Sequence, residues 1–143
     1  MASQKWNDQY SVGIAALDQI HRKLFGAIGE IENAIAQDAP REETNQLLRL
    51  LMEASHEHFA EEEMAMRVAQ YPSLQPHCEN HRRLAEKLEA FIARHDLKER
   101  KMNCRSINFL RDWLLYHIQN DDARYGAWFQ DRACREAAKK QAA

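Results

Sequence analysis

A chain of 143 residues, of which 45% are hydrophobic and 29% charged, is long enough to form one globular domain with its own core. Its net charge of −2, from 20 basic and 22 acidic residues, gives no electrostatic reason to expect nucleic acid or an anionic membrane as a partner. No run of about 18 apolar residues predicts a membrane span, and the N-terminus MASQKWNDQY lacks the apolar stretch of a signal peptide.

The first predicted helix runs roughly from Ile14 to Gln37, because apolar residues recur there at spacings of three and four. His21 lies on this apolar stripe, between Leu17 and Leu24. A break over residues 38–40, which ends in a proline, separates this helix from the next.

The second predicted helix runs from about Arg41 to Ala69. It ends before Tyr71–Pro72, because a proline disfavours helical geometry in the residue that precedes it. We expect its inner face to carry Leu47, Leu51, Ala54, His58, Glu62 and Ala65.

The third predicted helix starts after Ser73, a residue type that caps helices, and continues to about His95. Its inner stripe carries His77 and His81. Charged residues at 96–101 make the next connection. The inner stripe of the fourth predicted helix consists of Ile107, Leu110, Leu114, His117 and Ile118.

These elements predict an all-α fold, an antiparallel up-down-up-down four-helix bundle, because short connections place successive helices side by side. Only four glycines and three prolines interrupt the chain, which also favours long helices. We expect a single domain over residues 1–143, with an N-terminal extended segment at 1–12 and a weakly packed tail at 133–143.

The three cysteines, Cys78, Cys104 and Cys134, are odd in number and lack CxxC spacing. We therefore expect neither a disulfide framework nor a thiolate metal site. A reducing compartment, the cytoplasm, is the predicted location.

Polar residues on the inner stripes of all four predicted helices carry the functional signal. Burying so many polar groups without partners would cost several kcal/mol in total. Metal ions remove this cost by giving each group a ligand bond. Imidazole and carboxylate suit iron, zinc and manganese, and five imidazoles with two carboxylates suit two ions better than one. The candidate ligands are His21, His58, Glu62, His77, His81, His117 and one of two aspartates, Asp121 or Asp122.

The joint placement of these residues matters more than any one of them. A single histidine on an apolar stripe is more often a hydrogen-bonded core residue, and a His–Glu pair four residues apart is commonly a solvated contact. Two other histidines serve as controls. His56 lies roughly 200° round the helix from His58 and should be on the surface. His95, beside Asp96 at a helix end, should be a partner of the helix dipole.

Spacing leaves the final carboxylate open. Asp121 lies four residues after His117, which ideal helix geometry favours, whereas a residue five positions on lies about 140° off that face. Asp122 could turn inward only if the helix widens into a π-bulge, and such bulges gather at functional sites.

The sequence contains, in chain order, Val12–Gly13–Ile14, Leu17–Asp18 before His21, His58–Phe59–Ala60–Glu61–Glu62, Tyr71–Pro72 before His77 and His81, and Trp113–Leu114–Leu115–Tyr116–His117–Ile118 before Asp122. This combined pattern resembles the hemerythrins, most closely the prokaryotic bacteriohemerythrins. The resemblance covers roughly Trp6 to Phe129. One small departure is Gln19–Ile20, because a polar residue usually precedes the first histidine.

The resemblance implies a non-haem diiron centre that binds O2 reversibly, and it selects Asp122 over Asp121. Two iron ions are the implied cofactor, bridged by the two carboxylates and by an oxo or hydroxo group. The second iron keeps an open position, at which O2 is the expected ligand and small anions could also bind. The implied ligands are His77, His81 and His117 on the first iron, His21 and His58 on the second, and Glu62 and Asp122 on both.

The resemblance also implies an O2 pocket lined by Leu24, Phe59, Leu114 and Ile118. Each of these residues alone would be read as ordinary core. Placed together beside the under-coordinated iron, they would form an apolar wall that admits O2 and keeps out water and anions.

The resulting function is oxygen carriage, storage or delivery by a protein that is not an enzyme. An O2-sensing or redox-sensing module would use the same site. A ferritin-like diiron oxidase or peroxidase is a weaker alternative, because such sites use four carboxylates and two GluxxHis motifs, and this chain matches only two carboxylates. A structural zinc bundle is weaker still, since five histidines exceed a tetrahedral site.

Overall fold

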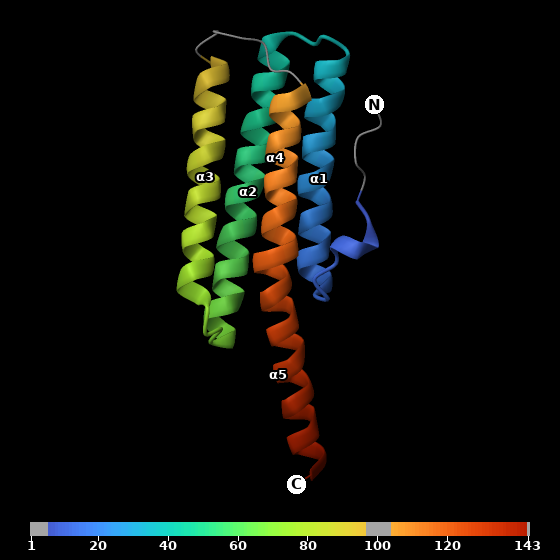
Figure 1. The fold of residues 1–143 in the computed structure, drawn as a ribbon, viewed down its shortest axis with the longest axis vertical. Helices are drawn as coiled ribbons and strands as arrows, with labels where there is room; N and C mark the ends of the chain where they lie inside the picture. Colours follow the sequence, from blue (N-terminus) through green and yellow to red (C-terminus); the bar gives the residue numbers. More distant parts are fainter. Residues whose placement is uncertain (1–5, 97–103, 143) are drawn as a thin grey trace.

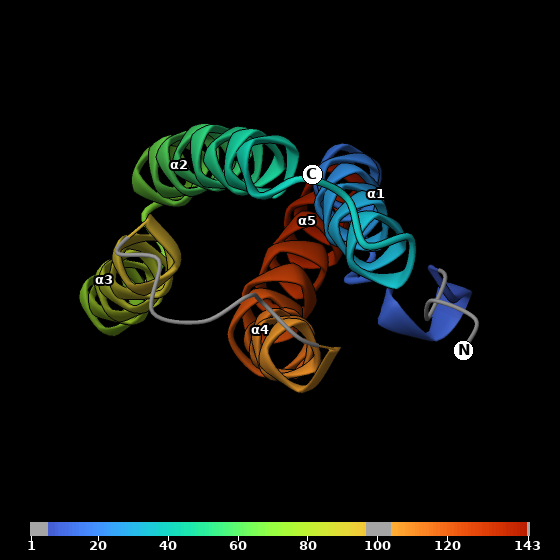
Figure 2. The same ribbon diagram turned by 90° about the horizontal axis from the view of Figure 1, so that it is seen from above.

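The computed structural model describes residues 6–96 and 104–142. The helices are α1 (Ala15–Ala36), α2 (Arg41–Ala69), α3 (Leu74–Asp96), α4 (Cys104–His117) and α5 (Ala123–Ala142). They form the predicted four-helix bundle, in which the rod made by α4 and α5 is the fourth member (Figure 1). Viewed from above, α1 packs against α2 and α4, and α3 packs against α2 (Figure 2).

The ends of α2 follow from its sequence. Pro40 precedes its first turn, where a missing N–H costs nothing. At the other end, Gln70 adopts a left-handed conformation with φ of 60°, and its N–H bonds to the carbonyls of Met66 and Arg67. Pro72 then prevents the helix from continuing.

The inner face of α2 differs in part from the prediction. Ala65 is exposed, and Leu47 and Ala54 are only half-buried. After Glu62 the next buried residue is Met66, four positions on, and not Ala65, three positions on. The buried face of the helix is therefore turned by one position there, and it still alternates three-residue and four-residue steps as an amphipathic helix does. The buried residues of α2 are Thr44, Leu48, Leu51, Ser55, His58, Phe59, Glu62, Met66 and Ala69.

The N-terminal segment covers the start of α1. We expected it to be extended, but it contains one 3₁₀ turn, η1 (Asp8–Tyr10). The Trp6 and Tyr10 rings each pack on Phe25, with centroids 5.7 and 5.5 Å away. Asp18 ties the segment to α1, because its Oδ1 accepts the Val12 N–H at 2.9 Å.

A π-helix, η2 (Ile118–Asp122), joins α4 to α5, so the three elements form one continuous rod. The far end of α5 projects past the other helices (Figure 1). The tail that we expected to pack weakly is helical as far as Ala142, and residues 133–141 are exposed. Within the described ranges, no helix is both long and apolar enough to cross a membrane.

Candidate metal centre

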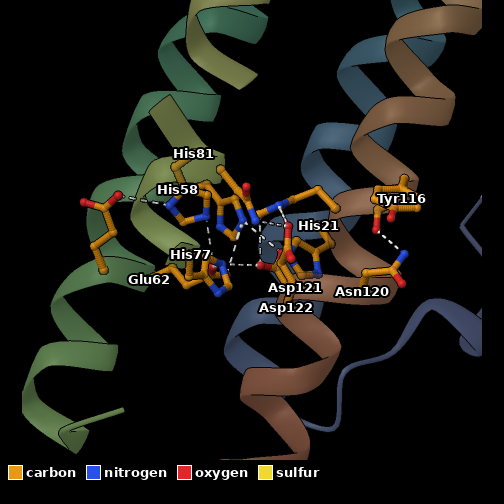
Figure 3. Close-up of polar contacts among 12 residues, drawn as sticks. His21, His58, Glu62, His77, His81, Tyr116, Asn120, Asp121 and Asp122 are labelled. Carbon is orange, nitrogen blue, oxygen red and sulfur yellow. Dashed lines mark hydrogen bonds and ion pairs between the residues drawn. The ribbon is translucent and has the colours of Figure 1, made fainter. Parts of the chain in front are cut away.

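All seven polar residues that the hemerythrin resemblance selects converge at the middle of the bundle (Figure 3). Each helix of the bundle supplies at least one of them, and each is almost completely buried. Their ligand atoms form two overlapping groups, in each of which every atom lies within 4.8 Å of the others. One group is Glu62, His77, His81, His117 and Asp122, and the other is His21, His58, Glu62 and Asp122.

The two carboxylates belong to both groups, and each directs one oxygen to each side. Oδ1 of Asp122 lies 2.9 Å from Nε2 of His77 and 3.0 Å from Nε2 of His117. Oδ2 of Asp122 lies 2.9 Å from Nε2 of His21 on the opposite side.

Glu62 repeats this division. Its Oε1 lies 2.5 Å from Nε2 of His77 and 3.1 Å from Nε2 of His81, whereas Oε2 lies 3.5 Å from Nε2 of His58. Bridging carboxylates between two cations require this split of oxygens.

The π-helix decides which aspartate faces inward. Because η2 widens the helix directly after His117, Asp122 turns into the bundle and is fully buried. Asp121 stays at the edge, where its Oδ2 lies 2.8 Å from Nδ1 of His117. Ideal helix geometry, which favoured Asp121, is therefore wrong at this position.

The donor set fits metal ions. Five imidazole Nε2 atoms and four carboxylate oxygens are buried, and the close contacts described above are with one another; none of these contacts has hydrogen-bond geometry among the described residues. Orphaned buried polar atoms are rare in folded proteins, because each costs about 1–3 kcal/mol. Cations held by imidazole and carboxylate would satisfy all nine atoms.

Charge within the cluster perturbs protonation in the metal-free protein. Burial disfavours protonation of His77, but the nearby carboxylates of Asp122 and Glu62 outweigh it and raise the pKa of His77 to about 9. Burial likewise opposes protonation of His117, and the charge of Asp122 together with Asp121 raises its pKa to about 10. Burial would raise the pKa of Asp122, but His117 holds it well below its usual range. Protons and cations therefore compete for the same nitrogens.

Outer carboxylates orient two of the three histidines in the larger group. Glu63 lies 3.1 Å from Nδ1 of His81, and Asp121 contacts His117 as described. The amide of Asn80 donates to Asp121 at 3.1 Å. Sequence reasoning missed Glu63 and Asn80, because their roles depend on which helix lies opposite. Such outer partners fix the ring orientation and raise ligand basicity.

The smaller group lacks this support. Nδ1 of His21 and Nδ1 of His58 are buried without a hydrogen-bond partner in the part of the chain that the structure describes. The His21 ring instead lies 6.4 Å from the Trp6 ring of the N-terminal segment. The two groups thus differ in donor number and in surroundings.

The four residues of the expected O2 pocket are all buried. Phe59 and Leu114 line a small cavity of about 40 Å³ between the helices. Leu24 and Ile118 are fully buried but do not line it. Phe59 separates this cavity from the cluster, because its ring stacks on His81 with centroids 4.2 Å apart.

Of the two control histidines, His56 lies outside the cluster, and the side chain of His95 lies outside the described residues. His56 is exposed, with Nε2 3.9 Å from a Glu89 carboxylate oxygen, as its position on the helix predicts. The expectation for His95 concerns its side chain, so it stays a prediction. Of the connection predicted at 96–101, Asp96 is the last residue of α3, and the rest lies outside the described residues.

The sequence is similar to that of known proteins over most of its length. The family model described as the hemerythrin HHE cation binding domain matches residues 12–129. A hemerythrin chain of Sipunculus nudus is 30% identical over 120 residues, which cover 84% of this chain and 88% of that protein. A bacteriohemerythrin of Pseudomonas aeruginosa (strain LESB58) is 30% identical over 129 residues, which cover 87% and 80% of the two chains.

Solved structures show the same fold. A crystal structure of wild-type hemerythrin superposes with a TM-score of 0.80 at 24% sequence identity, covering 87% of this chain and 95% of that chain. A point mutant of hemerythrin gives a TM-score of 0.82 at the same identity.

Proposed function

Because the chain belongs to the hemerythrin HHE cation-binding family, we propose that its buried cluster holds two iron ions and binds O2 reversibly, for carriage, storage or delivery and not for catalysis. The observation that carries this proposal is the unequal division of the ligands around two shared carboxylates.

Donor counting explains why an unequal division suits a carrier. Three histidines and two carboxylates give one ion five protein donors, whereas two histidines and the same carboxylates give the other ion four. With one further bridging ligand, an ion that prefers six ligands is filled on the first side and has one free position on the second. That free position, beside His21 and His58, is where O2 would bind.

An iron pair supplies two electrons that O2 can take up and give back. The protein must then keep the pair intact and keep competing ligands away. Phe59 blocks the approach toward His81, and the fully buried Leu24 and Ile118 exclude water near the centre. Imidazoles hold the ions without adding negative charge, so the two carboxylates offset only part of the metal charge.

The small number of carboxylates supports binding over oxidation. Ferritin-like oxidase sites surround their metals with four carboxylates and two histidines. The cluster has two carboxylates and five histidines. The set is also too large for one tetrahedral zinc ion.

Metal analysis combined with an oxygen electrode tests this proposal. We expect two irons per chain, a nearly colourless reduced protein, and a coloured form in air that fades when O2 is removed. Steady O2 consumption with a reducing substrate would indicate an oxidase instead. One zinc ion per chain would rule out the diiron centre.

A further inference from the structure

A second hollow lies on the outer side of the metal centre, between α3 and the rod of α4, η2 and α5. Its volume is about 400 Å³, which is within the range of small-molecule sites. His117 and Asp121 form part of its wall, so it meets the outer edge of the cluster. None of the roles described above uses this hollow.

Positive charge is concentrated around the hollow. Arg83, Lys87 and Arg124 line it, whereas Asp121 is the one carboxylate on its wall. Asp121 is already engaged, because its Oδ2 contacts His117 and accepts the Asn80 amide. This local excess of two positive charges lies on a chain whose net charge is −2. Clefts lined by one sign of charge attract ligands of the opposite sign.

The three cations have few competing partners. Arg83 is 3.6 Å from Glu79, at the outer limit of an ion pair, and its side chain is 65% exposed. Lys87 lies over the Trp113 ring, 4.2 Å from the ring centroid. Among the described residues, the Arg–carboxylate and Lys–carboxylate ion pairs include neither Lys87 nor Arg124.

Two aromatic residues complete the wall. Trp113 is half-buried, and the Tyr116 side chain lies at the surface, where it is 65% exposed. Figure 3 shows Tyr116 on the outer side of the rod, next to Asn120, whose amide donates to the Tyr116 carbonyl. The Tyr116 ring is the exposed one, since Lys87 and Phe109 already lie against the Trp113 ring. A flat ring can stack on an exposed aromatic face and on a guanidinium group.

We propose that this hollow binds a planar organic anion of the aryl phosphate class. The phosphate would lie among Arg83, Lys87 and Arg124, and the ring would lie against Trp113 and Tyr116. A phosphate monoester carries close to two negative charges at neutral pH, which matches the local excess of two. Arginine also binds phosphate through two parallel hydrogen bonds. The bound anion would sit against the Asp121–His117 pair at the edge of the metal centre.

Calorimetric titration of the metal-loaded protein tests the site with three probes: 1-naphthyl phosphate, inorganic phosphate and neutral 1-naphthol. We expect naphthyl phosphate to bind one per chain, at least about tenfold more tightly than either of the other two, since the hollow offers partners to both parts. Equal affinity for inorganic phosphate, or no binding of naphthyl phosphate, would overturn the proposal.

Matched variants locate the binding. Arg83→Gln and Arg124→Gln should each weaken naphthyl phosphate binding about tenfold or more, because each removes a charge-assisted hydrogen bond. Arg82→Gln is the control: Arg82 is adjacent to Arg83 but pairs with Glu79 and Glu86 and does not line the hollow. Equal weakening by all three variants would show that only net charge matters and would refute the site.

Tyr116→Ala tests the aromatic wall separately. It should weaken naphthyl phosphate binding and leave the response to inorganic phosphate unchanged. The exposed Tyr116 side chain can be removed without opening the core. The heat of binding does not depend on O2 chemistry, so a failure of the proposed oxygen function would leave this test intact.

Discussion

Asp122→Asn probes the shared carboxylate at the centre of the cluster. Each Asp122 oxygen faces a different set of histidines, with Oδ1 2.9 Å from His77 and Oδ2 2.9 Å from His21. An asparagine offers one oxygen and one NH₂ group, and the NH₂ cannot bind a cation. The substitution therefore removes a ligand from one ion and a negative charge from both.

The expected magnitude follows from comparison with the neighbouring aspartate. Among the histidines of the cluster, Asp121 contacts the outer nitrogen of His117, and loss of such an outer partner typically weakens metal binding about 10–100-fold. Losing a ligand should cost more than that. We expect Asp122→Asn to weaken binding of the second ion by more than about 100-fold, or about 2.7 kcal/mol, so that at most one ion remains tightly bound.

Iron per chain, measured after dialysis, is the assay, and far-UV circular dichroism checks that the variants remain helical. Asp121→Asn is the matched control and should keep two irons, as should His56→Ala. Two irons retained in Asp122→Asn, or iron lost only in Asp121→Asn, would refute the assignment of the bridging carboxylate.

Three further predictions test the fold, its charge balance and its apolar wall. Gly126→Ala should destabilise the protein, because a Cβ there would lie 2.0 Å from a backbone oxygen of the N-terminal segment. At Gly26 an added Cβ has no neighbour within 4 Å, so Gly26→Ala should stabilise the protein by up to about 1 kcal/mol. Urea titration of the two variants compares their free energies of unfolding. In the metal-free protein the pKa values of His77 and His117 rise from 6.5 to about 9 and about 10, so their contribution to stability is full below pH 6.5 and is lost as pH rises through those values. A melting temperature that does not fall over that range would contradict this. Leu114→Ala should cost about 2–5 kcal/mol and speed autoxidation while both irons stay bound; an unchanged autoxidation rate in the iron-replete variant would show that Leu114 does not guard the centre.

Local sequence signals predicted the bundle well. Helix limits agreed with the structure because prolines and turn residues mark them, as at Pro40 and Pro72. The exposed Ala65 shows the limit of this reasoning, since a small apolar residue fits either face and the stripe shifted by one position. Periodicity assigns faces less reliably than it assigns helices.

The candidate site, like the fold, could be predicted from the sequence only in part. Histidines on inner stripes can be recognised in the sequence because polar residues are costly there. Asp122 could not be chosen from spacing, because its inward orientation depends on the π-helix η2, and only the family resemblance selected it. The role of Glu63 depends on how α2 lies against α3. The roles of Asn80 and of the hollow beside Asp121 depend on how α3 lies against the rod of α4, η2 and α5, and no single segment encodes either arrangement.

Gas release from the oxygenated protein tests the central claim most directly. The protein should be reduced without air, exposed to O2 and then evacuated, and the O2 released should be measured for each pair of irons over several cycles. Reversible binding predicts close to one O2 released per iron pair in every cycle, with the colour lost and regained each time. Uptake without release, or release that falls to zero after the first cycle, would contradict oxygen carriage.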